Sequence, residues 1–238
     1  MMTLASRTPR QTFVLVHGSW HGGWCWRDVA AILEASGHRV FTPTLTGLGE
    51  RSHLMSAAIN LDTHIADVVD VFRQEQIEEA VLVGHSYGGW VISGALEEIG
   101  SQVSAAVFLD AHVPKDGERG LERAHFRALI EAVLESGGMA IDPPSAEFFH
   151  VKPERRDWVN ALLTPQPIGV SLQPIRLTGA RERVPRKVYI RGTGLPSHTF
   201  DAYRNEAEAN GWRIYDVDCG HDVMVDEPEK LAEILVDS

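Results

Sequence analysis

The chain has 238 residues, of which 44% are hydrophobic and 23% charged, enough to bury one substantial core. It carries 33 Asp and Glu against 22 Lys and Arg, a formal net charge of −11, and no basic block that could follow a phosphate backbone. This balance argues against nucleic acid as a partner. No apolar run is long enough for a signal peptide or a membrane span, so we expect a soluble, cytoplasmic protein with no membrane partner.

Six short β-rich runs follow one another along the chain, at 13–16, 39–42, 80–83, 105–109, 187–190 and 213–217. Helical patterns lie between or after most of them, at about 24–36, 61–76, 87–99, 198–210 and 227–237. Alternating strands and helices predict an α/β fold, with a six-stranded, mostly parallel sheet covered by helices on both faces. Ligands of such sheets bind at the carboxyl ends of the strands.

The stretch 113–186 interrupts this alternation. It contains several prolines and no strong strand, and its helical pieces are expected at 121–136, 146–149 and 155–163. We interpret it as a helical cap inserted after the fourth strand. The predicted organisation is therefore a core made of residues 1–112 and 187–238, with residues 113–186 as the cap.

The two cysteines, Cys25 and Cys219, are far apart in the sequence and belong to no C-x-x-C motif or larger cluster. We expect both to be buried free thiols, with no metal and no disulfide.

The most informative motif is Gly84-His85-Ser86-Tyr87-Gly88, which follows the apolar run 80–83 and precedes a helical pattern. A G-x-S-x-G sequence between a strand and a helix is typical of a nucleophile elbow, in which the serine occupies a strained turn. Glycine is expected at both ends because neighbouring backbone packs closely against such a turn. The pattern predicts Ser86 as a catalytic nucleophile.

A serine nucleophile needs a base and hydrogen-bond donors for the oxyanion. His221 follows the last strand and precedes the terminal helix, which makes it the candidate base. The backbone N–H groups of Tyr87 and of Ser19, in the loop after the first strand, are the candidate oxyanion hole. We expect His17, in the same loop, to be a structural hydrogen-bonding residue and not a base.

These motifs resemble the α/β-hydrolase superfamily over nearly the whole chain. The run His17-Gly-x-x-His-Gly-Gly-Trp-x-Trp26, the elbow and the Gly220-His221 end are similar to the hydroxynitrile lyase and plant methylesterase branch and its bacterial esterase relatives. The segment 44–52 also resembles the bacterial esterases, and we expect it to shape the loop beside the site. The resemblance implies an α/β-hydrolase fold and no cofactor, and it leaves a homodimer open because members of this branch are often dimers.

The acid of the triad departs from that branch, whose members carry an Asp after the fifth strand. The corresponding loop, 191–198, contains no carboxylate. Asp110 ends the fourth strand, a position similar to that of the acid in haloalkane dehalogenases, and we predict it as the residue that orients His221. The open alternatives are Asp201, Asp218 or no acid at all.

The residue after the histidine distinguishes between two reactions. Hydroxynitrile lyases of this branch resemble one another in a Lys at that position, whereas this chain has Asp222, whose charge would repel an anionic leaving group. We therefore predict a serine carboxylesterase acting on small, largely apolar esters that are often aromatic. Open alternatives are a methyl carbamate or amide hydrolase, a hydroxynitrile lyase or another C–C bond-cleaving enzyme, and an inactive ligand-binding receptor.

A small-molecule ester is the expected partner, and its binding residues should come from the strand-end loops and the cap. The candidates are Trp20, His85, His112, Phe126, Phe148, Phe149 and Trp158. Most of the aromatic ones have an alternative role as packing residues of the cap.

Overall fold

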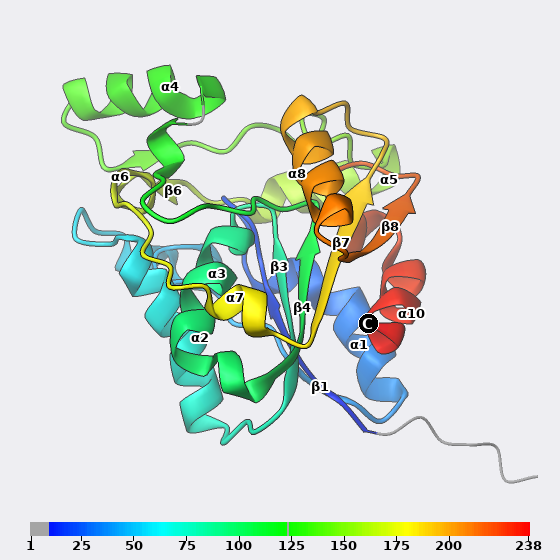
Figure 1. Cartoon of the computed structure of the whole chain (residues 1–238). Coiled ribbons are helices and arrows are strands. Elements are labelled where there is room, and N and C mark those ends of the chain that lie inside the picture. Colours follow the sequence, from blue (N-terminus) through cyan, green and yellow to red (C-terminus); the bar gives the residue numbers. More distant parts are fainter. Residues whose placement is uncertain (1–9, 123) are drawn as a thin grey trace, which may run out of the picture.

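A six-stranded parallel sheet forms the centre of the computed structural model, which describes residues 10–122 and 124–238 (Figure 1). The strand order is β2-β1-β3-β4-β7-β8, and every pairing is parallel. The predicted sheet is therefore confirmed. Its strands are β1 (Thr12–Val16), β2 (Arg39–Phe41), β3 (Ala80–His85), β4 (Val103–Leu109), β7 (Arg186–Gly192) and β8 (Arg213–Val217).

Successive side chains of each strand point to opposite faces of the sheet, so the strands divide their apolar residues between two cores. In β1, Phe13 and Leu15 enter one core, whereas Val14 and Val16 enter the other. Because both faces are covered, the strands are apolar on both sides and do not alternate with polar residues.

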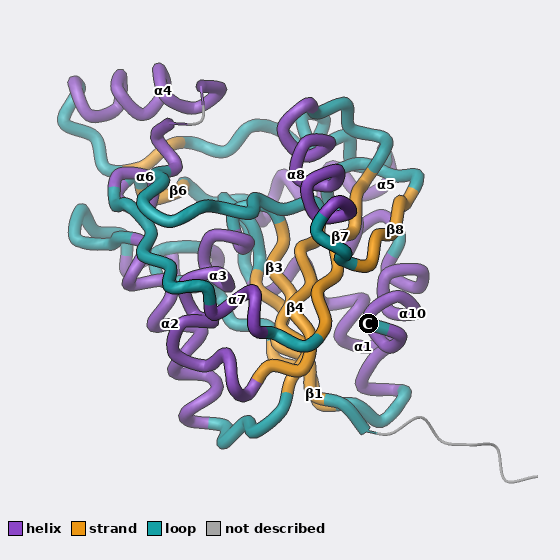
Figure 2. The backbone as a smooth tube through the Cα atoms, in the orientation of Figure 1, coloured by secondary structure: helices purple, strands orange, loops and turns teal. Residues whose placement is uncertain are grey.

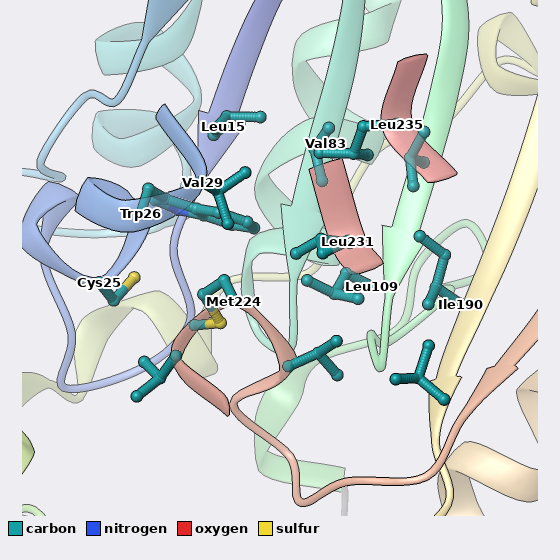
Figure 3. Packing of buried hydrophobic residues seen from close by; sticks show 14 of the residues in the cluster. Leu15, Cys25, Trp26, Val29, Val83, Leu109, Ile190, Met224, Leu231 and Leu235 are labelled. Carbon is teal, nitrogen blue, oxygen red and sulfur yellow. The ribbon is translucent and has the colours of Figure 1, made fainter. Parts of the chain in front are cut away.

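Two groups of helices cover these faces. The first core receives side chains from α1 (Arg27–Ala35), α9 (Val223–Asp226) and α10 (Pro228–Asp237), and Figure 3 shows Val29, Met224 and Leu231 packed beside the strands. The second core receives side chains from α2 (Leu61–Gln74), α3 (Gly88–Ile99) and α8 (His198–Ala209). Short 3-10 turns at 23–26, 49–54 and 100–102 complete this part of the chain.

Local capping explains where several helices begin. The Asn60 side chain accepts from the backbone N–H of Thr63, and the Thr63 hydroxyl accepts from the backbone N–H of Asn60 in a capping box that starts α2. The Ser197 hydroxyl accepts from the N–H of Phe200 at the start of α8, and Pro228 occupies the first position of α10.

The segment 113–186 leaves the sheet after β4 and contains short elements joined by long loops (Figure 2). Helices α4 (Ala124–Glu135) and α5 (Pro153–Leu162) confirm two of the predicted helical pieces, and α4 lies at the outer end of the molecule (Figure 1). Whether this segment is a separate cap unit stays a prediction. Its elements are a 3-10 turn at 120–122, α4 (Ala124–Glu135), β5 (Ala140–Ile141), α5 (Pro153–Leu162), β6 (Gln166–Pro167), α6 (Gly169–Leu172) and α7 (Ala180–Arg183); β5 and β6 form a small antiparallel pair.

The third helical piece, expected at 146–149, is wrong. These residues form turns in which the N–H groups of Phe148 and His150 donate to carbonyls three residues earlier, and His150 has a φ of +58°. The left-handed conformation of His150 stops the chain from continuing as a helix beyond these turns.

Within the described residues, no helix has both the length and the apolar character needed to cross a membrane. Cys25 and Cys219 are buried free thiols, as expected.

Candidate active site

Ser86 lies in a sharp turn between β3 and α3. Its φ of +53° falls in the left-handed region that non-glycine residues seldom adopt. A Cβ on Gly84 would come within 2.7 Å of the Gly88 carbonyl oxygen, so the backbone passes too close for any side chain there. The predicted strand, elbow and helix are therefore present, and the elbow holds Ser86 at the carboxyl end of β3.

Asp110 and His221 form a buried hydrogen bond. Oδ2 of Asp110 lies 2.6 Å from Nδ1 of His221, and the two residues are 0% and 4% exposed. An ionised carboxylate can only accept, so Nδ1 carries the proton and Nε2 is left as the basic nitrogen. Of the alternative acids, Asp201 hydrogen-bonds Arg191 and Asp218 is exposed.

Backbone hydrogen bonds between the strand ends fix Ser86 and Asp110 relative to each other. The N–H of Ser86 donates to the carbonyl of Leu109 (3.2 Å), and the N–H of His112 donates to the carbonyl of Ser86 (3.1 Å). Asp110 has a φ of +42° and donates its own N–H to the carbonyl of Ile190 on β7 (2.6 Å). Ser86 and Asp110, the candidate nucleophile and its candidate acid, thus extend two neighbouring strands of one sheet.

Aromatic rings surround the imidazole of His221. Phe200 lies nearly parallel to it with ring centres 5.1 Å apart, and Phe149 does so at 5.9 Å. The His221 backbone N–H also donates to the Phe149 carbonyl (2.8 Å), which ties the turn at 146–150 to the histidine loop. Phe149, expected to bind substrate, therefore contacts His221 directly. The contact of Phe200 could not be predicted, because a helical pattern does not show which face meets the site.

His85 supports His221 from within the protein. Its side chain is fully buried, its ring centre lies 4.5 Å from that of His221, and its Nε2 donates to the His221 carbonyl oxygen (3.0 Å). Burial, together with the neighbouring His221, lowers the pKa of His85 well below its usual value, so it is neutral. This position argues against the substrate contact expected for His85.

Two imidazoles orient the loop after β1. Nδ1 of His17 donates to the Gly18 carbonyl (2.8 Å), and Nδ1 of His21 donates to the Ser19 carbonyl (2.7 Å). In a trans peptide the C=O and the following N–H point in opposite directions, so the N–H of Ser19 points away from the His17 ring. The next N–H, that of Trp20, donates to the side chain of Gln166 (3.1 Å).

The Ser19 loop also approaches Ser86 closely. A Cβ on Gly18 would lie 2.8 Å from Cβ of Ser86, so only glycine allows this approach. Burial lowers the pKa of His17 to about 3, and its Nε2 accepts from the N–H of Leu45 (3.0 Å). His17 is thus the neutral structural residue that the sequence predicts.

The segment 44–52 supports this loop, as expected from the sequence. The Thr44 hydroxyl accepts from the N–H of Gly23 (2.8 Å), and the Thr46 carbonyl accepts from Nε2 of His64 (2.9 Å). The other nitrogen of His64 then accepts from the Tyr87 hydroxyl (3.0 Å), and burial lowers the pKa of His64 to about 4. The Tyr87 hydroxyl is thereby fixed to His64, and the Tyr87 backbone N–H is the group expected to bind the oxyanion.

His21 and Asp222 form a second buried pair. Nε2 of His21 lies 3.0 Å from Oδ2 of Asp222, and their side chains are 1% and 0% exposed. Since the other nitrogen of His21 donates to a carbonyl, both nitrogens need protons and His21 is an imidazolium. Burial opposes both charges, but the mutual attraction outweighs it, raising the pKa of His21 and lowering that of Asp222 to about 2.

This pair neutralises the charge of Asp222. Its carboxylate does not face a leaving group, because it is fully buried and its charge is balanced by His21. Asp222 follows His221 directly, so the pair joins the loop of His221 to the loop of Ser19. The absence of a lysine after the histidine still distinguishes the chain from the lyases it resembles.

The remaining predicted binding residues are dispersed. Trp20 is 6% exposed and donates from Nε1 to the Ile141 carbonyl (3.0 Å), which makes it largely a packing residue. Trp158 packs edge-on against Trp24 with ring centres 5.1 Å apart. The last three are placed as follows: Phe148 is 43% exposed beside Phe149, His112 is partly buried beside Phe200, and Phe126 belongs to α4, where its side chain lies outside the described residues.

One group of side chains in the described part of the chain has the composition of a metal site. His85, His221 and Asp222 each offer a ligand atom within 4.8 Å of the others. Two of the possible ligand nitrogens are already used in hydrogen bonds, because Nε2 of His85 donates to a carbonyl and Nδ1 of His221 donates to Asp110. We therefore treat the three as parts of the serine site.

The model of the alpha/beta hydrolase family matches residues 13–234. The chain belongs to this family. It is 40% identical over 235 residues to a carbendazim hydrolyzing esterase from Nocardioides sp. (strain SG-4G), covering 94% of this chain and 97% of that protein. It is 30% identical to putative methylesterase 14, chloroplastic, from Arabidopsis thaliana, over 75% of this chain and 57% of that protein.

Solved structures agree on the fold. An extracellular alpha/beta-hydrolase from a Paenibacillus species, described as sharing structural and functional homology with tobacco salicylic acid binding protein 2, superposes with a TM-score of 0.83 at 24% identity. The match covers 95% of this chain and 98% of that one. The resemblance to plant methylesterases and bacterial esterases is confirmed, and the relationship supports an ester-hydrolysing enzyme.

Proposed function

We propose that the protein hydrolyses small, largely apolar and often aromatic carboxylic esters through an acyl-enzyme on Ser86, with no cofactor. The observation that carries the proposal is the 2.6 Å hydrogen bond between His221 and Asp110 at the strand end beside the Ser86 elbow. Together these groups supply the nucleophile, the base and the orienting acid that acyl transfer needs.

The first half of the reaction forms the acyl-enzyme. Oγ of Ser86 attacks the ester carbonyl carbon while Nε2 of His221 takes the hydroxyl proton. The resulting oxyanion is bound by the N–H groups of Ser19 and Tyr87, and neither of these donates to an acceptor among the residues that the structure describes. The C–O bond to the alcohol then breaks, and His221 returns the proton to the departing alcohol.

The second half releases the acid product. His221 takes a proton from water, whose oxygen attacks the acyl carbon, and the bond to Ser86 breaks as His221 returns the proton to Oγ. Asp110 stays ionised throughout and stabilises the imidazolium that forms in each half.

A methyl carbamate is the second candidate substrate class, because the relative at 40% identity is named for carbendazim hydrolysis. Carbendazim is a methyl carbamate of an aromatic amine, and its carbonyl can be attacked by the same serine. Amides would follow the same route. The hydroxynitrile lyase and receptor alternatives draw no support from the paired Asp222 or from the intact Ser86 and His221.

The test is a screen of methyl, ethyl and aryl esters and aryl methyl carbamates with the purified protein. We expect rapid p-nitrophenyl acetate hydrolysis and stoichiometric labelling of Ser86 by a fluorophosphonate probe, both abolished in Ser86→Ala. Cyanide release from mandelonitrile without ester hydrolysis would indicate a lyase instead. A protein that binds ligands but resists the probe would be a receptor.

We further propose that the protein works in a reducing compartment, the cytoplasm, which the two unpaired buried thiols support. Its partner is a small molecule, and neither nucleic acid nor a membrane is expected. A homodimer remains a prediction that light scattering of the purified protein would test.

A further inference from the structure

Arg191 lies directly behind the acid of the site. It is the second-to-last residue of β7, its side chain is 3% exposed, and its Nη1 lies 2.9 Å from Oδ1 of Asp110. This is where the loop 191–198 begins, which contains no carboxylate of its own. Arg191, the first residue of that loop, thus contacts Asp110, which follows β4.

Every side of the guanidinium has a partner. Nη1 also donates to the Gly192 carbonyl, Nη2 donates to the Leu195 carbonyl (2.7 Å), and Nε donates to Oδ1 of Asp201 (2.9 Å). Burial opposes the charge of Arg191, but Asp110 and Asp201 outweigh it and raise the pKa of Arg191 above its usual value. The planar fork is therefore fixed and permanently charged.

This arrangement decides which oxygen of Asp110 faces the base. Oδ1 accepts from Arg191 and from the N–H of Gly192 (3.2 Å), whereas Oδ2 accepts from His221. Rotation of the Asp110 carboxylate would break the hydrogen bonds to Oδ1 and misalign Oδ2 with Nδ1 of His221. Since Asp110 is fully buried, the two donors to Oδ1 also replace the water that an ionised carboxylate would otherwise need.

The cation also changes the field at His221. Alone, Arg191 would cancel much of the negative charge with which Asp110 stabilises an imidazolium. Asp201, on α8 and 55% exposed, pairs with Arg191 and restores a net charge of −1 to the chain Asp110–Arg191–Asp201. Arg191 therefore sets the orientation of the Asp110 carboxylate, whereas Asp201 restores the negative charge that acts on His221.

We propose that Arg191 and Asp201 are positioning residues of the hydrolytic site: Arg191 fixes the oxygen of Asp110 that faces His221, and Asp201 offsets the positive charge this brings. The inference rests on the proposed ester hydrolysis for its kinetic readout. Its second readout, the titration of the His221 ring, needs no substrate.

Other ionisable groups also lie near the site, and the test leaves all of them unchanged. His85 on β3 lies against the His221 ring, and Asp222 interacts with the charges of His221 and His21. Asp226 interacts with Asp222, and Cys219 interacts with Asp226 and Asp110. A difference between variants at Arg191 and Asp201 is therefore assignable to the two substituted charges.

The experiment compares Arg191→Met with Asp201→Asn and follows the pH midpoint of kcat/KM for p-nitrophenyl acetate and the NMR titration of the His221 ring. Removing the cation should move both midpoints to higher pH by about 0.5–1 unit, and removing the exposed anion should move them to lower pH by a few tenths. Arg191→Met should also lower kcat about 10–100-fold with KM changed less than about 3-fold, because the substrate contacts remain.

Arg204 and Asp216 provide a matched control. Arg204 lies on α8, as Asp201 does, and pairs with Asp216 at 3.0 Å on the surface. Arg204→Met and Asp216→Asn should leave both midpoints and kcat unchanged. Arg191→Lys, which keeps the charge but loses the fork, should lower kcat with a smaller change of midpoint than Arg191→Met.

The proposal would be overturned if the pH midpoints of Arg191→Met and Asp201→Asn moved in the same direction. It would also be overturned if neither midpoint moved in folded protein. If Arg191→Met does not fold, Arg191→Lys and the surface variant Asp201→Asn still decide it. If the wild-type protein hydrolyses no ester, the proposed function fails; the NMR midpoints then still decide whether these two residues act on His221.

Discussion

Nδ1 of His221 lies 2.6 Å from Oδ2 of Asp110. Asp110 directly follows β4 and does not lie in the loop after β7. Replacing the acid with its amide tests this relationship. Asp110→Asn should lower kcat/KM by about 10⁴-fold, because an amide no longer fixes the imidazole tautomer or stabilises the imidazolium. Circular dichroism of the variant should match the wild type, and activity within a few-fold of the wild type would remove Asp110 from the triad.

The buried pair of His21 and Asp222 should stabilise the fold in a limited pH range. The raised pKa of His21 gives stability that is present below about 6.5 and lost as pH rises through the folded value. The lowered pKa of Asp222 gives stability that is present above about 3.8 and lost as pH falls toward about 2. A double-mutant cycle with His21→Asn and Asp222→Asn should show the largest coupling between these limits.

Urea unfolding from pH 3 to 9 measures that coupling. Asp222→Asn alone should lower the free energy of unfolding by about 3–5 kcal/mol near pH 6, since it leaves a buried cation unpaired. A coupling that stays constant up to pH 9 would contradict the assignment of His21 as an imidazolium.

Asp226 should destabilise the protein at neutral and alkaline pH. Burial raises the pKa of Asp226 to about 6, so the folded protein holds this proton more tightly than the unfolded chain does and stability falls as pH rises from about 4 to 6. Asp226→Asn should therefore raise the Tm at pH 8 but not at pH 4. The exposed change Asp237→Asn is the control, and a lower Tm for Asp226→Asn at pH 8 would show that its hydrogen bonds to the Lys152 N–H matter more than its charge.

Close packing behind the elbow should make Gly89 intolerant of any side chain. A Cβ there would come within 2.0 Å of the His112 carbonyl oxygen, so Gly89→Ala should lower the free energy of unfolding by about 1–3 kcal/mol or more and reduce activity. Gly100→Ala, whose Cβ would meet nothing closer than 3.8 Å, is the control and should be neutral or slightly stabilising. Equal stability of both variants in urea would refute the packing argument.

Much of this architecture could be predicted because it depends on local pattern. The strands are apolar on both faces, and the elbow glycines are required by the close packing of the turn itself. The sheet and the turn at Ser86 can therefore be predicted from short stretches of sequence. Asp110 was predicted because it ends the strand next to the elbow strand. The pairing of His21 with Asp222 spans 201 positions, and no local pattern indicates it.

The turn at 146–150 shows a second limit. Its apolar residues predict a helix, but the chain is bent there by contacts with the histidine loop: a Cβ on Gly220 would lie 2.4 Å from the His150 carbonyl oxygen. Such tertiary contacts override local helix preference. The same reason explains why Phe149 and Phe200 stack on His221 while Trp158 packs elsewhere.

Because Ser86 and Asp110 follow two paired strands, the register of β3 with β4 aligns the proposed nucleophile with its proposed acid. A slip of one residue would turn every side chain of β4 to the opposite face and remove the carboxylate from the imidazole. Enzyme activity therefore reports whether β3 and β4 are paired in the correct register. Spectroscopic measures of secondary-structure content do not give this information. During refolding, the return of fluorophosphonate labelling should report the moment at which these two strands acquire their native alignment.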